Sequence, residues 1–172
     1  MTRLAAIDIG TNTLRLLVAE RVGSRFQPLA RHSVIVGLGR RLRETGGIGE
    51  EELSAALGVL RRFLREMDRQ HVAEYRACGT ACLREASNRG AFLAAAADLG
   101  VEVEVIGAAE EARRTWAGIR MGVTGRPGDV AMDIGGGSTE FICGPGAGES
   151  VSIPMGVVVV STLPPLSDPP EQ

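Results

Sequence analysis

Two glycine-containing stretches carry residues that could hold phosphate groups. Residues 8–13 read Asp-Ile-Gly-Thr-Asn-Thr, and residues 133–140 read Asp-Ile-Gly-Gly-Gly-Ser-Thr-Glu. Each stretch lies between two apolar runs, which predicts a strand, a tight turn and a second strand. Glycine lets backbone N–H groups approach an anion closely, and the hydroxyl and amide side chains add donors. Two such hairpins facing one another would clamp a phosphate; the alternative is a pair of plain glycine turns.

Carboxylates accompany the second turn on both sides. Asp133 ends the strand before it and Glu140 lies on the strand after it, so both are expected beside a bound phosphate. Two carboxylates next to a phosphate need a cation between them, and oxygen ligands of this kind suit a divalent metal. A P-loop is excluded, because all 19 basic residues are arginine and that site requires lysine.

Glu110 and Glu111 are the acid–base candidates, at the start of a helix expected over residues 108–123. A carboxylate there could activate water if it faced the two turns. The alternative is that both residues only complement the positive end of the helix dipole. Arg84, in another short helical segment, could reach a phosphate or could pair helices at the surface.

The remaining sequence predicts an α/β domain around the first hairpin. Three antiparallel strands and two parallel strands are expected over residues 4–9, 14–21, 26–38, 74–78 and 101–106. Together they would form a mixed five-stranded sheet with flanking helices. Besides the helix at 108–123, helices are expected over residues 50–70 and up to about residue 99, the latter capped by Ser87 or Asn88.

The second hairpin is expected to begin a second domain that is cut short. A linker at residues 123–129 precedes it, and residues 151–155 are expected to form its third strand. Residues 157–160, four valines, predict further extended structure, whose edge would be aggregation-prone unless something covers it. The last segment is rich in proline and predicts a disordered tail. The predicted domains are residues 1–124, 125–163 and 164–172.

Composition excludes several other classes. The formal net charge of −2 gives no overall basic field to recruit a nucleic acid duplex. Three cysteines at irregular spacing argue against a disulfide framework and favour free thiols in a reducing compartment. No apolar run is long enough to span a membrane, and no signal-peptide pattern precedes the first strand. We therefore expect a cytoplasmic protein that does not engage membranes.

Two further segments lie between the turns in a fixed order. Residues 79–88 read Gly-Thr-Ala-Cys-Leu-Arg-Glu-Ala-Ser-Asn, and residues 106–113 read Ile-Gly-Ala-Ala-Glu-Glu-Ala-Arg. With the two turns, they make the chain resemble the exopolyphosphatase/guanosine pentaphosphate phosphohydrolase family, within the actin/sugar-kinase/heat-shock-70 ATPase fold. The resemblance implies an actin-like ATPase (ribonuclease H-like) domain, followed by the first strands of a second one. It also implies removal of terminal phosphate from polyphosphate or guanosine pentaphosphate.

The resemblance further implies a role for each matched position. Glu111 would be the base that activates the attacking water, and Arg84 would bind substrate phosphate. Mg²⁺ would be held by Asp133, Glu140 and Asp8. In-line phosphoryl transfer to water needs an oriented water, a metal ion and neutralisation of charge, and these residues would supply them. The turns would bind phosphate through Gly10, Thr11, Asn12, Thr13, Gly135, Gly136, Gly137, Ser138 and Thr139.

Three functions follow from these observations. The first is a magnesium-dependent phosphohydrolase. The second is a catalytically weak or inactive phosphate-binding or regulatory fragment, because the second domain is expected to be incomplete. An incomplete domain also favours self-association as a homodimer. The third is an ATPase or sugar-kinase relative, which is disfavoured because the adenosine-binding part would lie outside the sequence.

Overall fold

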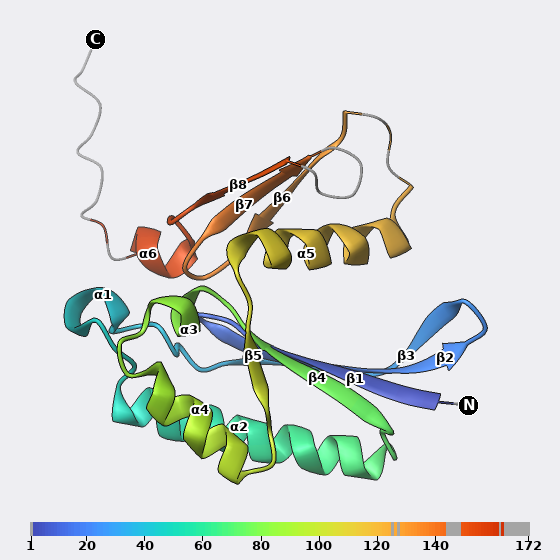
Figure 1. The fold of residues 1–172 in the computed structure, drawn as a ribbon, viewed down its shortest axis with the longest axis horizontal. Coiled ribbons are helices and arrows are strands. Elements are labelled where there is room, and N and C mark those ends of the chain that lie inside the picture. Colours follow the sequence, from blue (N-terminus) through green and yellow to red (C-terminus); the bar gives the residue numbers. More distant parts are fainter. Residues whose placement is uncertain (1, 125, 127, 144–148, 162, 164–172) are drawn as a thin grey trace.

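Two β-sheets organise the structure (Figure 1). The computed structural model describes residues 2–124, 126, 128–143, 149–161 and 163. The larger sheet contains β1 (Thr2–Ile9), β2 (Thr13–Val22), β3 (Arg25–Ile35), β4 (Glu74–Gly79) and β5 (Val103–Val105). The smaller sheet contains β6 (Val130–Ile134), β7 (Thr139–Cys143) and β8 (Glu149–Ile153). The helices are α1 (Leu42–Thr45), α2 (Glu50–Arg69), α3 (Ala81–Glu85), α4 (Arg89–Asp98), α5 (Ala108–Gly122) and α6 (Val157–Ser161).

The larger sheet has the strand order β3-β2-β1-β4-β5. Its first three strands are joined by hairpins and pair antiparallel, whereas β4 and β5 run parallel to β1. This arrangement confirms the mixed five-stranded sheet predicted from the sequence. The smaller sheet is an antiparallel meander in the order β6-β7-β8.

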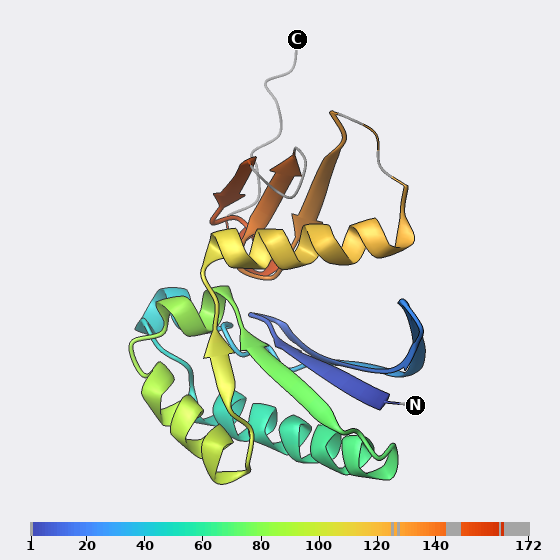
Figure 2. The same ribbon diagram turned by 45° about the vertical axis from the view of Figure 1, so that its right-hand side comes forward.

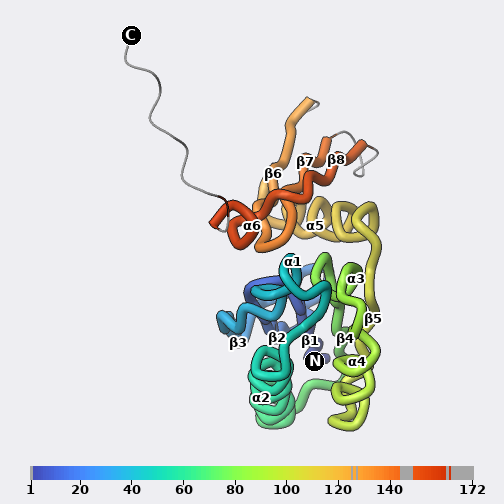
Figure 3. The backbone as a smooth tube through the Cα atoms, turned by 90° about the vertical axis from the view of Figure 1, so that its left-hand side faces the viewer, coloured from blue at the N-terminus to red at the C-terminus, as the bar shows by residue number. Residues whose placement is uncertain are grey.

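The hydrophobic core lies between one face of the larger sheet and the helices α2 and α4, which cover that face (Figure 3). Strand alternation explains which side chains enter it. In β1, Ile7 and Ile9 are buried in the core, which turns Asp8 to the opposite face. In β2, Leu14 and Leu16 are buried, which turns Arg15 to that same opposite face. The core side chains contributed by the apolar stripe of α2 are Ala56, Leu57, Val59, Leu60, Phe63 and Met67.

The smaller sheet and α5 lie across the other face of the larger sheet (Figures 1 and 2). Helix α5 packs against β7 and β8. The face of the smaller sheet that is turned away from α5 exposes the apolar side chains Val130, Met132, Ile134, Phe141, Val151 and Ile153. The domain division predicted at residue 124 stays a prediction, and the tail predicted at residues 164–172 lies outside the described residues.

The valine run at residues 157–160 is helical, so the prediction of extended structure there is wrong. The N–H groups of Val157 and Val158 donate to the carbonyls of Gly135 and Gly136, and the N–H of Val160 closes the first turn of α6. These tertiary hydrogen bonds satisfy the donors at the start of the helix. They outweigh the preference of β-branched residues for strands, which is weak and depends on context.

The sequence predicts that no segment spans a membrane and that the cysteines are free thiols, and the described residues bear on both points. None of the helices in that part of the chain is long and apolar enough to cross a membrane. All three cysteines are free thiols, and Cys82 is fully buried. Burial raises the pKa of Cys82 to about 12, so this thiol stays protonated and packs as a small apolar side chain.

Candidate active site

In the described part of the chain, the turn between β1 and β2 uses the carbonyls of Thr11 and Asn12 in hydrogen bonds and leaves the N–H groups of the same two residues without an acceptor. The N–H of Gly10 donates to the carbonyl of Thr13 at 3.1 Å, which closes the turn. The carbonyls of Thr11 and Asn12 accept hydrogen bonds of 2.8–2.9 Å from N–H groups in residues 36–39. Within the described residues, nothing accepts from the N–H groups of Thr11 and Asn12. These two donors are therefore available to an anion.

The turn between β6 and β7 repeats this arrangement. The N–H of Gly135 donates to the carbonyl of Ser138 at 2.9 Å. The carbonyls of Gly135 and Gly136 accept from the first two N–H groups of α6, at 3.0 and 2.9 Å. In the same part of the chain, the N–H groups of Gly136 and Gly137 meet no acceptor. Both turns thus present a pair of free backbone donors.

The two turns touch each other, and little room for a side chain is left where they meet. A Cβ on Gly136 would lie 3.0 Å from the backbone nitrogen of Asn12, and a Cβ on Gly137 would lie 2.8 Å from Oγ1 of Thr11. A side chain at Gly136 would press on the backbone of the first turn, whereas the obstacle at Gly137 is the end of a side chain. Between them lies a cavity of about 220 Å³. The predicted site residues that line this cavity are Asp8, Gly10, Thr11, Asn12, Thr13, Glu111, Asp133, Gly135, Gly136, Gly137, Ser138 and Glu140.

Thr139 and Arg84 also belong to the predicted site, but the structure gives them other contacts. The hydroxyl of Thr139 donates to the carbonyl of Met155 at 2.6 Å, which ties β7 to the segment before α6. Arg84 donates to Glu111 rather than lining the cavity. A direct contact between Arg84 and phosphate stays a prediction.

Glu111 is held at the edge of the cavity by Arg84. The Nη1 atom of Arg84 lies 2.6 Å from Oε2 of Glu111 and 3.0 Å from the carbonyl of Ile106. Burial raises the pKa of Glu111, Arg84 opposes that shift, and the nearby carboxylates of Glu140 and Asp8 add to it. A carboxyl with a raised pKa is a better proton acceptor, which suits a general base. The neighbouring Glu110 points elsewhere and pairs with arginines of its own helix.

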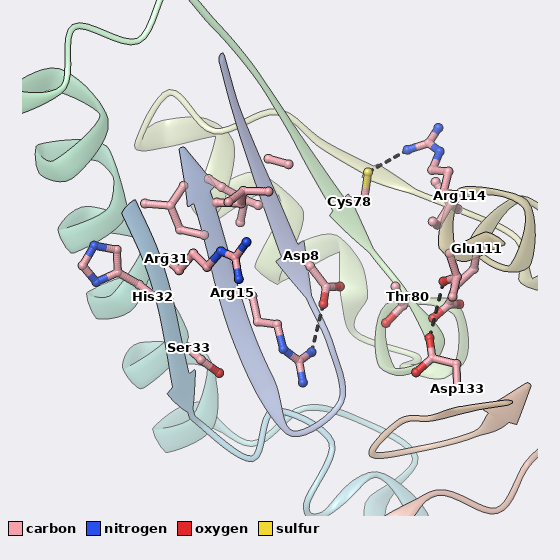
Figure 4. A pocket seen from close by; sticks show the side chains of 16 residues that line it. Asp8, Arg15, Arg31, His32, Ser33, Cys78, Thr80, Glu111, Arg114 and Asp133 are labelled. Atoms are coloured by element: carbon pink, nitrogen blue, oxygen red, sulfur yellow. Dashed lines mark hydrogen bonds and ion pairs between the residues drawn. The ribbon is translucent and has the colours of Figure 1, made fainter. Parts of the chain in front are cut away.

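Asp8, Glu111 and Asp133 reach this region from different elements (Figure 4). Asp8 pairs with Arg15, with 3.1 Å between Oδ2 and Nη1. Burial raises the pKa of Asp8, the hydrogen bond from Arg15 opposes the shift, and the charge of Asp133 adds to it. Asp133 itself accepts a hydrogen bond of 3.4 Å from the hydroxyl of Thr115.

Three residues at the site were not predicted from the sequence, although each has a local signal. Arg15 is the cross-strand partner of Asp8, so the hairpin register alone would have placed it there. Thr80 follows β4 directly, and its N–H donates to Ile9 at the end of β1. Thr115 stands one helical turn after Glu111 and therefore shares its side of α5.

The carboxylates of this region fit a magnesium ion that shares its coordination with phosphate. Asp133 and Glu140 are opposed across β6 and β7, and Asp8 is close enough to Asp133 for their charges to interact. Among the described residues, no group of three acidic, histidine or cysteine side chains is placed to hold a metal ion by itself. Mg²⁺ is usually bound by one or two carboxylates together with phosphate oxygens and water. The donor set therefore suits Mg²⁺ in the presence of a phosphate ligand.

A wider cleft extends from the turns along the open face of the larger sheet (Figure 4). Its volume is about 600 Å³, and Asp8, Thr80 and Glu111 line both the cleft and the cavity. Farther along, the Sγ atom of Cys78 lies 2.8 Å from Nη1 of Arg114. The site is therefore open toward a space larger than the turn cavity.

The topology and the paired turns define an actin-like ATPase fold. A structural likeness supports this class: the ethanolamine utilization protein EutJ from Carboxydothermus hydrogenoformans superimposes with a TM-score of 0.51 at 18% identity, over 91% of this chain and 53% of that chain. At this level of identity the likeness concerns the fold alone.

The chain belongs to the Ppx/GppA phosphatase family, whose family model matches residues 17–171. An exopolyphosphatase from Cytophaga hutchinsonii is similar, with 34% identity and a TM-score of 0.84 over 93% of this chain and 53% of that chain. The Ppx/GppA family member of Aquifex aeolicus is 29% identical, with a TM-score of 0.81 over 93% of this chain and 53% of that chain. These findings confirm the family resemblance seen in the sequence. The chain spans about half the length of these solved relatives.

Proposed function

We propose that this chain binds the terminal phosphates of a phosphoanhydride, inorganic polyphosphate or guanosine pentaphosphate, and removes the last phosphate by attack of water. The proposal is carried by one observation: the two turns line one cavity together with Glu111, and four of their N–H groups find no acceptor among the described residues. Backbone donors of this kind bind phosphate oxygens. Similarity to an exopolyphosphatase supports the same substrate class.

Glu111 would act as the general base. As the oxygen of water bonds to the terminal phosphorus, the carboxylate accepts a proton from that water, and the bond from phosphorus to the bridging oxygen breaks. The products are inorganic phosphate and a substrate shorter by one phosphate. Arg84 fixes one oxygen of Glu111 by its 2.6 Å contact and leaves the other oxygen for water. The turn N–H groups stabilise the negative charge on the phosphate oxygens.

Negative charge in the cavity explains why a cation is part of the proposal. Asp8, Glu111, Asp133 and Glu140 all line it, and Arg15 is the arginine among its lining residues. A bound Mg²⁺, held by Asp133, Glu140 and Asp8 together with phosphate oxygens, would neutralise charge on the phosphate. The protein's own residues then position the phosphate and the attacking water.

Phosphate release by the purified 172-residue chain tests the proposal. We expect release from polyphosphate or guanosine pentaphosphate in the presence of Mg²⁺, and its loss in Glu111→Gln. Glu110→Gln is the matched control, because Glu110 is the adjacent residue on α5 and pairs with Arg113 and Arg114 at the surface. No release above the level of Glu111→Gln from either substrate would refute hydrolysis by this chain.

A second function, phosphate binding without turnover, is favoured by a separate observation. The chain spans about half of the solved relatives, and the smaller sheet exposes an apolar face. Binding of inorganic tripolyphosphate without phosphate release would support this alternative. The homodimer expected from the sequence stays a prediction, which sedimentation of the purified chain would test.

A further inference from the structure

The segment that follows β8 is bonded to the backbone of the second turn. The first two N–H groups of α6 donate to the carbonyls of Gly135 and Gly136 at 3.0 and 2.9 Å. Just before α6, Gly156 is buried against the turn. A Cβ added to Gly156 would overlap the carbonyl carbon and oxygen of Gly136. Because these are backbone atoms, the turn itself would have to move to make room.

The carbonyl direction in this turn determines where the free N–H groups point. In a trans peptide, the carbonyl of one residue and the N–H of the next point in opposite directions. The carbonyls of Gly135 and Gly136 are directed at α6, so the N–H groups of Gly136 and Gly137 are directed away from it. These two N–H groups find no acceptor among the described residues, and both glycines line the cavity.

The first turn is fixed in a similar way by a different segment. The N–H of Gly39 donates to the carbonyl of Thr11 at 2.8 Å, and a Cβ on Gly39 would lie 2.5 Å from Cγ2 of Thr11. That obstacle is the end of a side chain and can move more easily than backbone. The tighter constraint therefore belongs to the second turn.

We propose that residues 154–161 orient the second turn for phosphate binding, with Gly156 as a positioning residue. The segment holds the two turn carbonyls outward, which keeps the N–H groups of Gly136 and Gly137 available to the ligand. The identity of that ligand rests on the proposed function. The positioning itself rests on the hydrogen bonds and close packing of the segment.

Binding of inorganic tripolyphosphate, followed by calorimetry and by NMR of the turn amides, tests this role. In the wild-type chain, the ligand should shift the amide resonances of Gly136 and Gly137. In Gly156→Ala, we expect the affinity to fall about tenfold or more, the loss expected when a hydrogen bond to a charged group is misplaced. The matched control is Gly118→Ala, since Gly118 lies exposed in α5 with open space around it, and its affinity should be unchanged.

A second variant covers the case in which Gly156→Ala does not fold. Val157→Pro removes the N–H that donates to Gly135, at the first position of α6, where proline fits a helix. It should weaken tripolyphosphate binding while the unfolding midpoint stays near that of the wild type. Folded variants that bind tripolyphosphate as tightly as the wild type would overturn the inference. It would also be overturned if the ligand did not shift the amide resonances of Gly136 and Gly137 in the wild type. A chain that shows these effects but releases no phosphate would contradict the proposed hydrolysis only.

Discussion

Asp133 and Glu140 lie directly opposite one another across the β6–β7 ladder. The matching positions of the first hairpin are Asp8 and Arg15, which form an ion pair. The two hairpins therefore share a backbone design but differ in charge, because the first contains its own counter-charge and the second does not. Like charges directly opposite in a ladder are destabilising, so the second hairpin is where a cation is expected to have the larger effect.

Replacing Glu140 with glutamine should stabilise the chain by about 0.2–1 kcal/mol in the absence of divalent cations, because it relieves this repulsion. The amide can still accept the 2.8 Å hydrogen bond from Ser152. The same change should reduce the rise in unfolding temperature that Mg²⁺ together with inorganic tripolyphosphate produces in the wild type. Thermal unfolding in EDTA alone, and in Mg²⁺ with tripolyphosphate, measures both effects. An equal rise in the two proteins would contradict the assignment of Glu140 to the metal.

Replacing Arg15 with glutamine should raise the pKa of Asp8 further, because Arg15 opposes the upward shift caused by burial. Both side chains of the pair keep about half of their surface open to solvent, 59% for Arg15 and 45% for Asp8, so the free energy of unfolding should change by less than about 1 kcal/mol. An NMR titration that follows the carboxyl carbon of Asp8 gives the pKa directly. Arg69→Gln is the control, since it breaks a pair on α2 with Glu66 and should leave Asp8 unchanged. A pKa of Asp8 that stays the same or falls in Arg15→Gln would contradict the expectation.

Replacing Asn88 with alanine should lower the free energy of unfolding by about 1–2 kcal/mol, since two hydrogen bonds are lost. Its Oδ1 accepts from the N–H of Ile48 and its Nδ2 donates to the carbonyl of Ile48, both at 2.8 Å. Urea unfolding measures the change. Ser87→Ala removes a single exposed bond to Gly46 and should cost less. If Ser87→Ala lowered the free energy of unfolding more than Asn88→Ala does, the two hydrogen bonds of Asn88 would contribute little.

Asn88 also shows which part of the fold the sequence predicts well. The side chain was expected to cap a helix, and the residue does stand immediately before α4, but it makes no capping hydrogen bond. Its partner, Ile48, is distant in the sequence and becomes adjacent only through tertiary packing. Element positions follow local patterns such as the alternation in β1 or the apolar stripe of α2, whereas side-chain partners across the core do not.

The same distinction applies to the site. The turns at Gly10 and Gly135 could be predicted, because glycine and polar residues between apolar strands are local signals. The partner of Arg84 could not, because it depends on how α3 packs against the start of α5. The helical conformation of residues 157–161 was missed for a related reason, since it depends on carbonyls supplied by the second turn.

Replacing Arg84 with methionine should raise the pKa of Glu111 further, because Arg84 opposes the upward shift that burial causes. Glu111 must be deprotonated to act as a base, so the acidic limb of the phosphate-release profile should move to higher pH.

The pH dependence of the free energy of unfolding should also change in Arg84→Met. A folded-state pKa above the unfolded value means that the folded chain binds the proton more tightly, so stability falls as pH rises from about 4.5 through the folded pKa. In Arg84→Met, this fall in stability should extend to higher pH. When Glu111→Gln is added, the part of the fall that comes from Glu111 should disappear. Unfolding midpoints across this pH range measure it, and an acidic limb or a stability loss that moves to lower pH would contradict the role given to Arg84.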